Sequence, residues 1–207
     1  MTVPLIDVVR PPGGFACIVA DYPWSFSDKG HRGAPERAPG GRYKTVPFCD
    51  LILMGEQVQR LAAKDAVLFL WVPPAFMVSG QGADAARSCG FVPKTEMAWV
   101  KCRRPRAEKE CKRGDKLPYP KLQIGLGHYT RAAHEPLILA VRGRPKILDH
   151  SIPAAFFAGR TVHSKKPEKL QTIAEKLCEG PRLELFARRH RAGWLCWGDQ
   201  LQEGPTR

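Results

Sequence analysis

The sequence has 207 residues, which fits a single domain with an ordinary hydrophobic core, and 43% of its residues are apolar. It contains 33 lysine and arginine residues against 20 aspartate and glutamate residues, so its formal net charge is +13. No apolar run is long enough for a membrane span, and the amino-terminal segment does not resemble a secretory signal peptide. We therefore predict one domain over residues 1–207, in the cytoplasm, with no membrane contact and with a polyanionic partner such as a nucleic acid.

Seven cysteine residues are spread along the chain without a Cys-x-x-Cys pair. Several lie in apolar segments, as the buried reduced thiols of cytosolic proteins do. Cys102 and Cys111 could be grouped with His128 or His134 around a metal, but these spacings match no zinc pattern. We predict no metal site and no disulfide framework.

The first predicted element is a strand at Phe15–Ala20, which is a continuous apolar run without alternation. Such a run is typical of a strand that is covered on both faces of an α/β sheet. It is followed at once by Asp21, Tyr22, Pro23 and Trp24. Because α/β sheets bind ligands at the carboxyl ends of parallel strands, this corner is a candidate reactive site. A carboxylate there can accept hydrogen bonds from an exocyclic amine, and aromatic side chains can stack on a nucleobase.

Two long stretches, at about residues 25–42 and 102–123, are rich in glycine, proline, lysine and arginine. This composition predicts two basic flexible loops. Both loops could contact the phosphate groups of a nucleic acid, which would position a substrate without reading its sequence. For the first stretch, a solvated surface insertion with no role in binding is the alternative.

The remaining predicted elements alternate between helices and strands, as in an α/β fold. Helices are predicted at residues 50–64, 76–89 and 167–178. Strands are predicted at residues 66–72, 95–101, 136–141, 183–188 and 194–200. Residues 145–160 are predicted to form a linker.

Charged residues also occur near the predicted strand ends. Glu135 stands just before the strand at 136–141, and we expect it to pair with Arg131. Lys166 lies at the start of the helix at 167–178, where the helix dipole disfavours a positive charge. Its position therefore indicates a role other than surface solvation. Trp71, beside Pro73-Pro74, is expected to be a packing residue rather than a recognition residue.

Seven segments resemble, in the same order, segments of the adenine-N6 methyltransferases whose catalytic motif is DPPW. This family includes the eukaryotic messenger-RNA methyltransferases and many bacterial and phage DNA methyltransferases. The matching segments are DYPW (21–24), YKTVP (43–47), FLW (69–71), TEMAWVK (95–101), GHY (127–129), HSKKP (163–167) and WGDQL (197–201). The chain departs from the family pattern at Tyr22, which replaces a proline, and at Asp199 and Arg191, where relatives often have asparagine.

The resemblance implies a Rossmann-like methyltransferase fold with a mostly parallel sheet flanked by helices. It also implies a permuted motif order, in which the catalytic motif precedes the cofactor-binding strand at 183–188. Residues from the two ends of the chain can then meet only if the strands at 15–20 and 183–188 are neighbours. Relatives often work as homodimers or as heterodimers with a related subunit, and the DNA-modifying branch occurs in bacterial or phage-infected cells.

The resemblance further implies that S-adenosylmethionine is the cofactor and that the N6 amine of adenine is the acceptor. The implied catalytic residues are Asp21, Tyr22, Pro23 and Trp24. The implied substrate-binding residues are Tyr43, Lys44, His128, Tyr129 and Arg131. The implied cofactor-binding residues are Cys17, Ile18, Asp21, Lys166, Arg188, His190, Asp199 and Gln200.

The adenine amine is a weak nucleophile, because its lone pair is delocalised into the ring. Asp21 and the backbone carbonyl of Tyr22 can each accept one of its N–H groups and direct the lone pair at the methyl group, while Trp24 and Tyr43 stack on the base. A sulfonium methyl donor makes a cysteine nucleophile unnecessary, in contrast to cytosine-carbon methylation. The predicted substrate is DNA, and the alternatives are RNA or an inactive nucleic-acid-binding subunit. A kinase is disfavoured because the chain has no glycine-rich phosphate loop.

Overall fold

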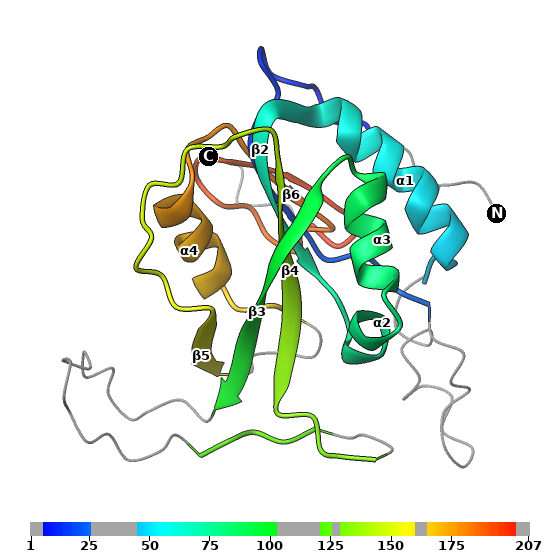
Figure 1. Ribbon diagram of the computed structural model, residues 1–207, viewed down its shortest axis with the longest axis vertical. Coiled ribbons are helices and arrows are strands. Elements are labelled where there is room, and N and C mark those ends of the chain that lie inside the picture. Colours follow the sequence, from blue (N-terminus) through cyan, green and yellow to red (C-terminus); the bar gives the residue numbers. More distant parts are fainter. Residues whose placement is uncertain (1–5, 26–44, 103–120, 126–128, 160–164, 202–207) are drawn as a thin grey trace.

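The computed structural model describes residues 6–25, 45–102, 121–125, 129–159 and 165–201. These residues form one seven-stranded sheet with helices on both faces (Figure 1). No helix among them is long and apolar enough to cross a membrane. The same residues contain no group of three or more His, Cys, Asp or Glu side chains that could hold a metal ion.

The strand order is β5-β3-β4-β2-β1-β6-β7. The strands are β1 (Phe15–Ala20), β2 (Ala62–Trp71), β3 (Val92–Cys102), β4 (His134–Arg142), β5 (Ala155–Gly159), β6 (Arg182–Leu185) and β7 (Trp194–Trp197). Strand β4 is antiparallel to its neighbours β2 and β3, and the other four strand pairs are parallel. The sheet is therefore mostly parallel, as predicted.

The helices cover the sheet from two sides. They are α1 (Phe48–Leu61), α2 (Pro74–Val78), α3 (Gln81–Ser88) and α4 (Lys169–Leu177). Helices α1 to α3 lie on one face and α4 lies on the other (Figure 1).

Two of the predictions are wrong in kind, and several others differ at their ends: the helix predicted at 50–64 ends at Leu61, and the strand predicted at 183–188 ends at Leu185. The single helix predicted at 76–89 is divided into α2 and α3, because Gly80 adopts a left-handed conformation with φ 83° that a helix cannot continue. The predicted linker at 145–160 contains β5, which pairs with the free side of β3. Phe156 of this strand is buried while Phe157 is half exposed, so the strand packs one face only.

The hydrophobic core consists of two layers separated by the sheet. Ile18 and Leu68 point to the layer under α1 and α3, whereas Cys17 and Val67 point to the layer under α4. This explains why β1 reads as a continuous apolar run, since both of its faces are covered.

Strand β1 lies between β2 and β6 and is parallel to both. Ala20 at its end is opposite Leu185, and the Asp21 amide lies 3.4 Å from the Leu185 carbonyl oxygen. The expectation that the strands at 15–20 and 183–188 are neighbours is therefore confirmed. Because β4 is antiparallel, its first residues lie at the same side of the sheet as the ends of β1, β2, β3 and β6. We call this side the carboxyl edge.

The cysteine residues in the described part of the chain are free thiols. Cys17, Cys89, Cys102 and Cys178 are buried, whereas Cys49 is exposed. The prediction of mostly buried cysteines is confirmed for these residues.

Candidate active site

A tight turn follows β1 at the carboxyl edge. The Trp24 amide donates to the Tyr22 carbonyl over 2.9 Å, which closes a three-residue turn around Pro23. The Val46 amide donates to the Pro23 carbonyl over 2.8 Å, and the Trp24 indole donates to the Trp71 carbonyl over 3.0 Å. The turn is therefore tied both to the segment before α1 and to the end of β2, which fixes the position of the residue before it, Asp21.

The Asp21 carboxylate begins a chain of four alternating charges. Lys166 Nζ lies 3.1 Å from Asp21 Oδ1 and 3.0 Å from Glu135 Oε2. The other Glu135 oxygen lies 2.7 Å from Lys101 Nζ. Glu135 therefore bridges two lysine residues, and the expected pairing of Glu135 with Arg131 is wrong.

Burial and charge compete in setting the pKa values of these groups. Burial raises the pKa of Asp21 above its ordinary value, although the neighbouring Lys166 opposes this shift. For Glu135, burial also acts to raise the pKa, but Lys166 and Lys101 outweigh it and the net shift is downward. Burial would lower the pKa of Lys166, yet Asp21 and Glu135 raise it. Lys166 therefore stays protonated and acts at this site as a fixed positive charge, not as a base.

Each of the two lysine ammonium groups lies over the ring of a tryptophan. Lys166 Nζ lies 5.3 Å from the centre of the Trp71 ring, and Lys101 Nζ lies 5.4 Å from that of Trp99. The two indoles pack edge to face with their centres 6.3 Å apart. Trp71 is buried, which confirms the expectation that it is a packing residue, and it also faces the charged group nearest to Asp21.

The side chains of Tyr22 and Trp24 point into the protein. The Tyr22 hydroxyl lies 3.2 Å from the Cys89 sulfur, and burial raises the pKa of this phenol well above its ordinary value, so it stays neutral. The Trp24 ring is 3% exposed and stacks on Phe76 with a centre distance of 5.0 Å. In this structure both rings pack inside the protein, and the stacking of Trp24 on a base stays a prediction.

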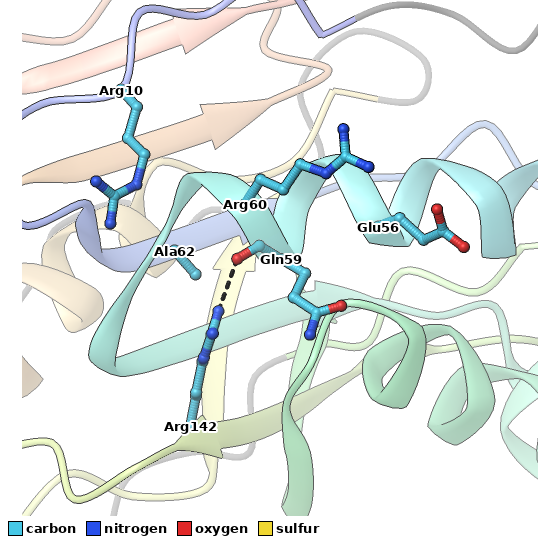
Figure 2. Close-up of a pocket in the computed structure, with 6 residues that line it drawn as sticks. All are labelled: Arg10, Glu56, Gln59, Arg60, Ala62 and Arg142. Carbon is cyan, nitrogen blue, oxygen red and sulfur yellow. Dashed lines mark hydrogen bonds between the residues drawn. The ribbon is translucent and has the colours of Figure 1, made fainter.

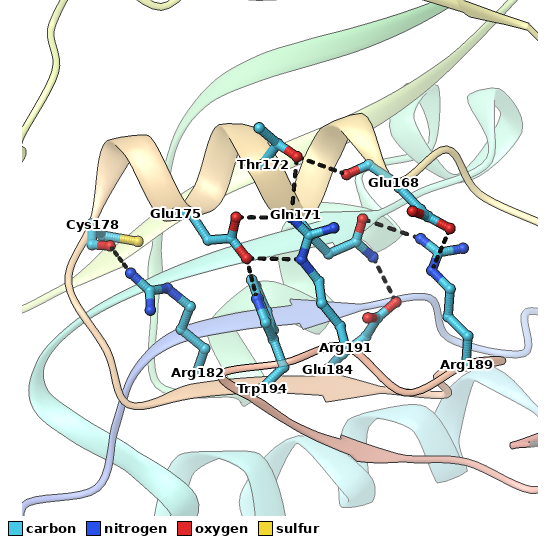
Figure 3. Close-up of polar contacts among 10 residues, drawn as sticks. All are labelled: Glu168, Gln171, Thr172, Glu175, Cys178, Arg182, Glu184, Arg189, Arg191 and Trp194. Atoms are coloured by element: carbon cyan, nitrogen blue, oxygen red, sulfur yellow. Dashed lines mark hydrogen bonds and ion pairs between the residues drawn. The ribbon is translucent and has the colours of Figure 1, made fainter. Parts of the chain in front are cut away.

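Polar contacts fasten α4 to β6 and β7 next to the site (Figure 3). Arg191 donates to both Glu175 oxygens over 2.8 Å, and the Trp194 indole donates to Glu175 over 2.7 Å. Arg189 contacts the Lys166 carbonyl over 3.4 Å and lies 3.2 Å from Glu168. The segment that carries Lys166 is thereby held by residues that follow β6.

Glu184 of β6 is a buried acidic residue that the sequence analysis did not single out. Its Oε1 accepts a 2.7 Å hydrogen bond from Gln171, while its Oε2 is buried and has no hydrogen-bond partner among the described residues. Burial is the main cause that raises the pKa of this carboxyl. A glutamate inside the otherwise apolar run at 183–187 is the sequence signal that could have identified it.

The backbone leaves β6 in an uncommon conformation. Phe186, directly after the strand, has a φ of 60°, which is in the left-handed region that bulky residues rarely adopt. Its ring packs edge to face on Tyr22 and on Trp197. Such conformations are found where the surroundings impose them, and they cluster at ligand sites.

The structure gathers some of the predicted site residues and leaves others apart. Asp21, Lys166 and the Tyr22 carbonyl meet at the carboxyl edge, and Arg188 and His190 follow the adjacent β6. Asp199 and Gln200 are exposed after β7, and Tyr129 and Arg131 are exposed before β4. Cys17 and Ile18 are fully buried on β1, so only their backbone can reach a ligand. Tyr43, Lys44 and His128 lie outside the described residues.

Comparison with known proteins gives matches along nearly the whole chain. The sequence pattern of the MT-A70 family matches residues 15–200. The chain is also 30% identical over 201 residues to the N6-methyladenosine RNA methyltransferase MTA1 of Pyricularia oryzae. That match covers 90% of this chain and 47% of the relative, so the chain spans about half the length of this relative. With the family match running from β1 to the end of β7 and the sheet of a Rossmann-like methyltransferase fold, the chain belongs to the MT-A70 family.

Proposed function

We propose that this protein transfers a methyl group from S-adenosylmethionine to the N6 amine of adenine in DNA. The observation that supports this most is the Asp21 carboxylate at the carboxyl edge of the sheet, followed directly in the chain by the turn that carries the Tyr22 carbonyl. Two acceptors placed one residue apart suit an amino group, which has two N–H groups to donate.

Both acceptors have room for a bond to the amine. Lys166 Nζ lies 3.1 Å from Asp21 Oδ1, and we assign the other carboxylate oxygen, Oδ2, as the acceptor for the amine. The Tyr22 carbonyl accepts one bond, from the Trp24 amide, and retains its second lone pair. Because the acceptor on Tyr22 belongs to the backbone, a tyrosine can replace the family's proline without removing it. Two bonds to the amine would fix its orientation, which is where we place the main catalytic effect of the chain.

Lys166 would keep Asp21 ionised while the amine binds. A protonated carboxyl could not accept both the lysine and the amine, and burial alone pushes Asp21 toward protonation. The positive charge of Lys166 opposes this effect at a distance of 3.1 Å. The role proposed for Lys166 is therefore electrostatic and positional.

The residues around the carboxyl edge also fit the cofactor of the family. MT-A70 methyltransferases use S-adenosylmethionine, which supplies an electrophilic methyl group on a positively charged sulfur. A carboxylate near the sulfonium is favourable, and the free buried oxygen of Glu184 could accept a bond from a hydroxyl group. The residues that would hold the cofactor are Asp21, Lys166, Glu184, Arg188 and Asp199.

RNA is the second candidate substrate. DNA is our first candidate because many bacterial and phage members of the family modify DNA, but the DYPW motif is common to the DNA- and RNA-modifying members and does not separate them. The name of the relative from Pyricularia oryzae, an RNA methyltransferase, favours RNA. The net charge of +13 suits both polyanions equally.

The proposal is tested by incubating the protein and methyl-labelled S-adenosylmethionine with DNA or RNA of the same sequence. Mass spectrometry of the released nucleosides should find label in N6-methyldeoxyadenosine, at a higher rate than in N6-methyladenosine from RNA. The reverse order would replace DNA by RNA as the substrate. The absence of label in both, together with no heat on titration with S-adenosylmethionine, would contradict an enzymatic role and favour an inactive subunit.

A further inference from the structure

An open surface cavity of about 500 Å³ lies far from Asp21 (Figure 2). Its lining residues are Arg10, Glu56, Gln59, Arg60, Ala62 and Arg142. They come from three separate parts of the chain: the segment before β1, the junction of α1 with β2, and the last residue of β4. Three guanidinium groups are thus brought together by the fold and not by closeness in sequence.

The cavity lies at the opposite side of the sheet from the carboxyl edge. Arg142 is opposite Ala66 on β2, whereas Trp71, at the other end of β2, is opposite Leu137. Ala62 precedes Trp71 by nine residues, which corresponds to roughly 30 Å along an extended strand. A ligand in the cavity would therefore not contact the proposed catalytic residues.

The side chains around the cavity carry a surplus of positive charge. Arg142 donates a hydrogen bond of 2.7 Å to the Gln59 carbonyl, one of the carbonyl groups at the carboxyl end of α1 that have no partner within the helix. The side chains of Arg10 and Arg60 form no ion pair or hydrogen bond with any residue in the described ranges, and the same holds for the side chain of Glu56. The lining residues comprise three arginines and one carboxylate, Glu56, and the side chains of Arg10 and Arg60 have donors to spare.

Gly14 provides the space in which Arg10 lies. A Cβ atom at this position would stand 2.7 Å from Arg10 Nη2 and 2.7 Å from the Ala62 carbonyl oxygen. The φ of Gly14, +86°, is also one that other residues rarely adopt. The absence of a side chain at residue 14 therefore lets the Arg10 guanidinium approach the start of β2 and line the cavity.

We propose that this cavity binds a backbone phosphate of the nucleic-acid substrate, at a distance from the adenine held by Asp21. The inference rests on the proposed function, since it needs a nucleic-acid partner. Arginine side chains match phosphate oxygens with paired donors, and guanidinium groups are the side chains most used for this purpose. The partial negative charge at the end of α1 opposes an anion, but Arg142 already neutralises the carbonyl that would be closest.

This second contact sets a minimum length for tight binding. One turn of a nucleic-acid duplex spans about 34–36 Å, or about 10 base pairs. A duplex shorter than this cannot reach from the carboxyl edge to the cavity. Only longer duplexes should therefore contact the arginine residues and bind more tightly because of them.

The test compares wild-type protein with the double variant Arg10→Gln/Arg60→Gln. Arg142 is left in place because its hydrogen bond to the Gln59 carbonyl stabilises the end of α1. A matched control, Arg87→Gln/Lys146→Gln, removes two exposed charges whose ion-pair partners are Asp84 and Glu179. Binding of duplexes of about 8 and about 30 base pairs is measured by fluorescence anisotropy at several salt concentrations. On the long duplex, the negative slope of log K against log salt should be smaller in magnitude by about 1 than for the control, since the loss of one phosphate contact reduces that magnitude by about 0.9. On the short duplex the two variants should behave alike.

The outcomes separate this inference from the proposed function. If the wild-type protein binds neither DNA nor RNA, the proposed function fails and this inference fails with it. If it binds and methylates the long duplex but the arginine variant keeps the slope of the control, only this inference is overturned. Binding of inorganic phosphate that the variant loses, without a change on the long duplex, would overturn it in favour of a small-anion site. Single Arg60→Gln should give about half of the effect, which guards against a folding defect in the double variant.

Discussion

Lys166 contacts two carboxylates that come from different strands of the sheet. Asp21 follows β1 and Glu135 lies in β4, and both are about 3 Å from the ammonium group. The contact between Lys166 and Glu135 does not involve Asp21. If an amine displaced Lys166 from Asp21, Glu135 would still hold the lysine in place. Glu135 thus positions the positive charge without needing to touch the substrate.

Replacing Glu135 by glutamine should destabilise the protein. Lys101 is 8% exposed and its ion pair with Glu135 would be lost, so the free energy of unfolding should fall by about 1–3 kcal/mol, the cost of a buried group without a partner. Urea unfolding measures this change. In a double-mutant cycle with Lys101→Met the two substitutions should be non-additive, and additive effects would show that the two residues do not interact.

The sequence shows which residues are charged, but it does not show which of them form ion pairs. Asp21 could be identified because it ends a buried strand. The partners of Glu135 could not, since they depend on the register of β3 against β4, which places Glu135 opposite Trp99 and near Lys101. A register is set by the whole sheet and not by the local pattern, so the nearby Arg131 was the wrong choice.

At the scale of secondary structure, α4 is joined to the end of the sheet by charge rather than by apolar packing alone. Glu175 of α4 accepts hydrogen bonds from Arg191 and Trp194 (Figure 3). The hydrogen bonds from Arg191 are the main cause that lowers the pKa of Glu175, to about 2. An unfolded chain would have a glutamate pKa of about 4.3.

The contribution of Glu175 to stability should depend on pH. A folded-state pKa below the unfolded value gives stability that is present above about pH 4.3 and is lost as the pH falls toward 2. Because the Glu175 side chain is 31% exposed, we expect about 1–2 kcal/mol once solvent screening is included. Denaturant unfolding of wild type and Glu175→Gln should differ by this amount at pH 6, and the difference should shrink as the pH falls below about 4 and become small near pH 2. If the free energies of unfolding of the two proteins differed equally at both pH values, the ion pair would not be the cause of the difference. Glu179→Gln, at an exposed position, serves as the control.

Helices α1 and α3 approach closely at Gly55. A Cβ atom there would lie 2.0 Å from the Ser88 hydroxyl and 2.8 Å from the Ser88 backbone carbon. Gly55→Ala should therefore push the two helices apart and lower the free energy of unfolding by about 1–3 kcal/mol, the usual cost of overpacking. Thermal or urea unfolding measures the change, with Leu53→Ala, an exposed position on the same helix, as a control. A stabilised Gly55→Ala variant would mean that helix propensity outweighs the contact.

Element types were easier to predict than element directions and ends. The apolar runs of β1, β2 and β4 predict strands. The apolar run of β4, however, does not predict that this strand is antiparallel to its neighbours. Helix α4 could be predicted from its apolar spacing and from Pro167 before it. The sequence does not predict strand β5, because its five residues bury one face only and begin two residues after Pro153.

At the scale of the whole molecule, the two sides of the sheet have different chemistry. The carboxyl edge holds a balanced set of charges around Asp21, whereas the opposite edge holds the arginine cavity. The neighbouring positions of β1 and β6 follow from the permuted order that the sequence resemblance implied, and they bring both ends of the chain to the carboxyl edge. The pairing of Glu135 with Lys101 and Lys166 could not be predicted from the sequence, because it depends on strand register, whereas Glu184 has a local sequence signal in the apolar run at 183–187.

The central claim is that the Asp21 carboxylate holds the acceptor amine, and it is tested most directly by single-turnover methyl transfer with Asp21→Asn. Asparagine keeps the size of the side chain but removes its charge and one acceptor. Unfolding and S-adenosylmethionine titration should first show that the variant is folded and still binds the cofactor, with Glu179→Gln as the control. We expect the rate of N6-methyladenine formation to fall by about 100-fold or more, the usual effect of removing a group that stabilises the transition state. A variant that binds the cofactor and methylates adenine at the wild-type rate would contradict the account.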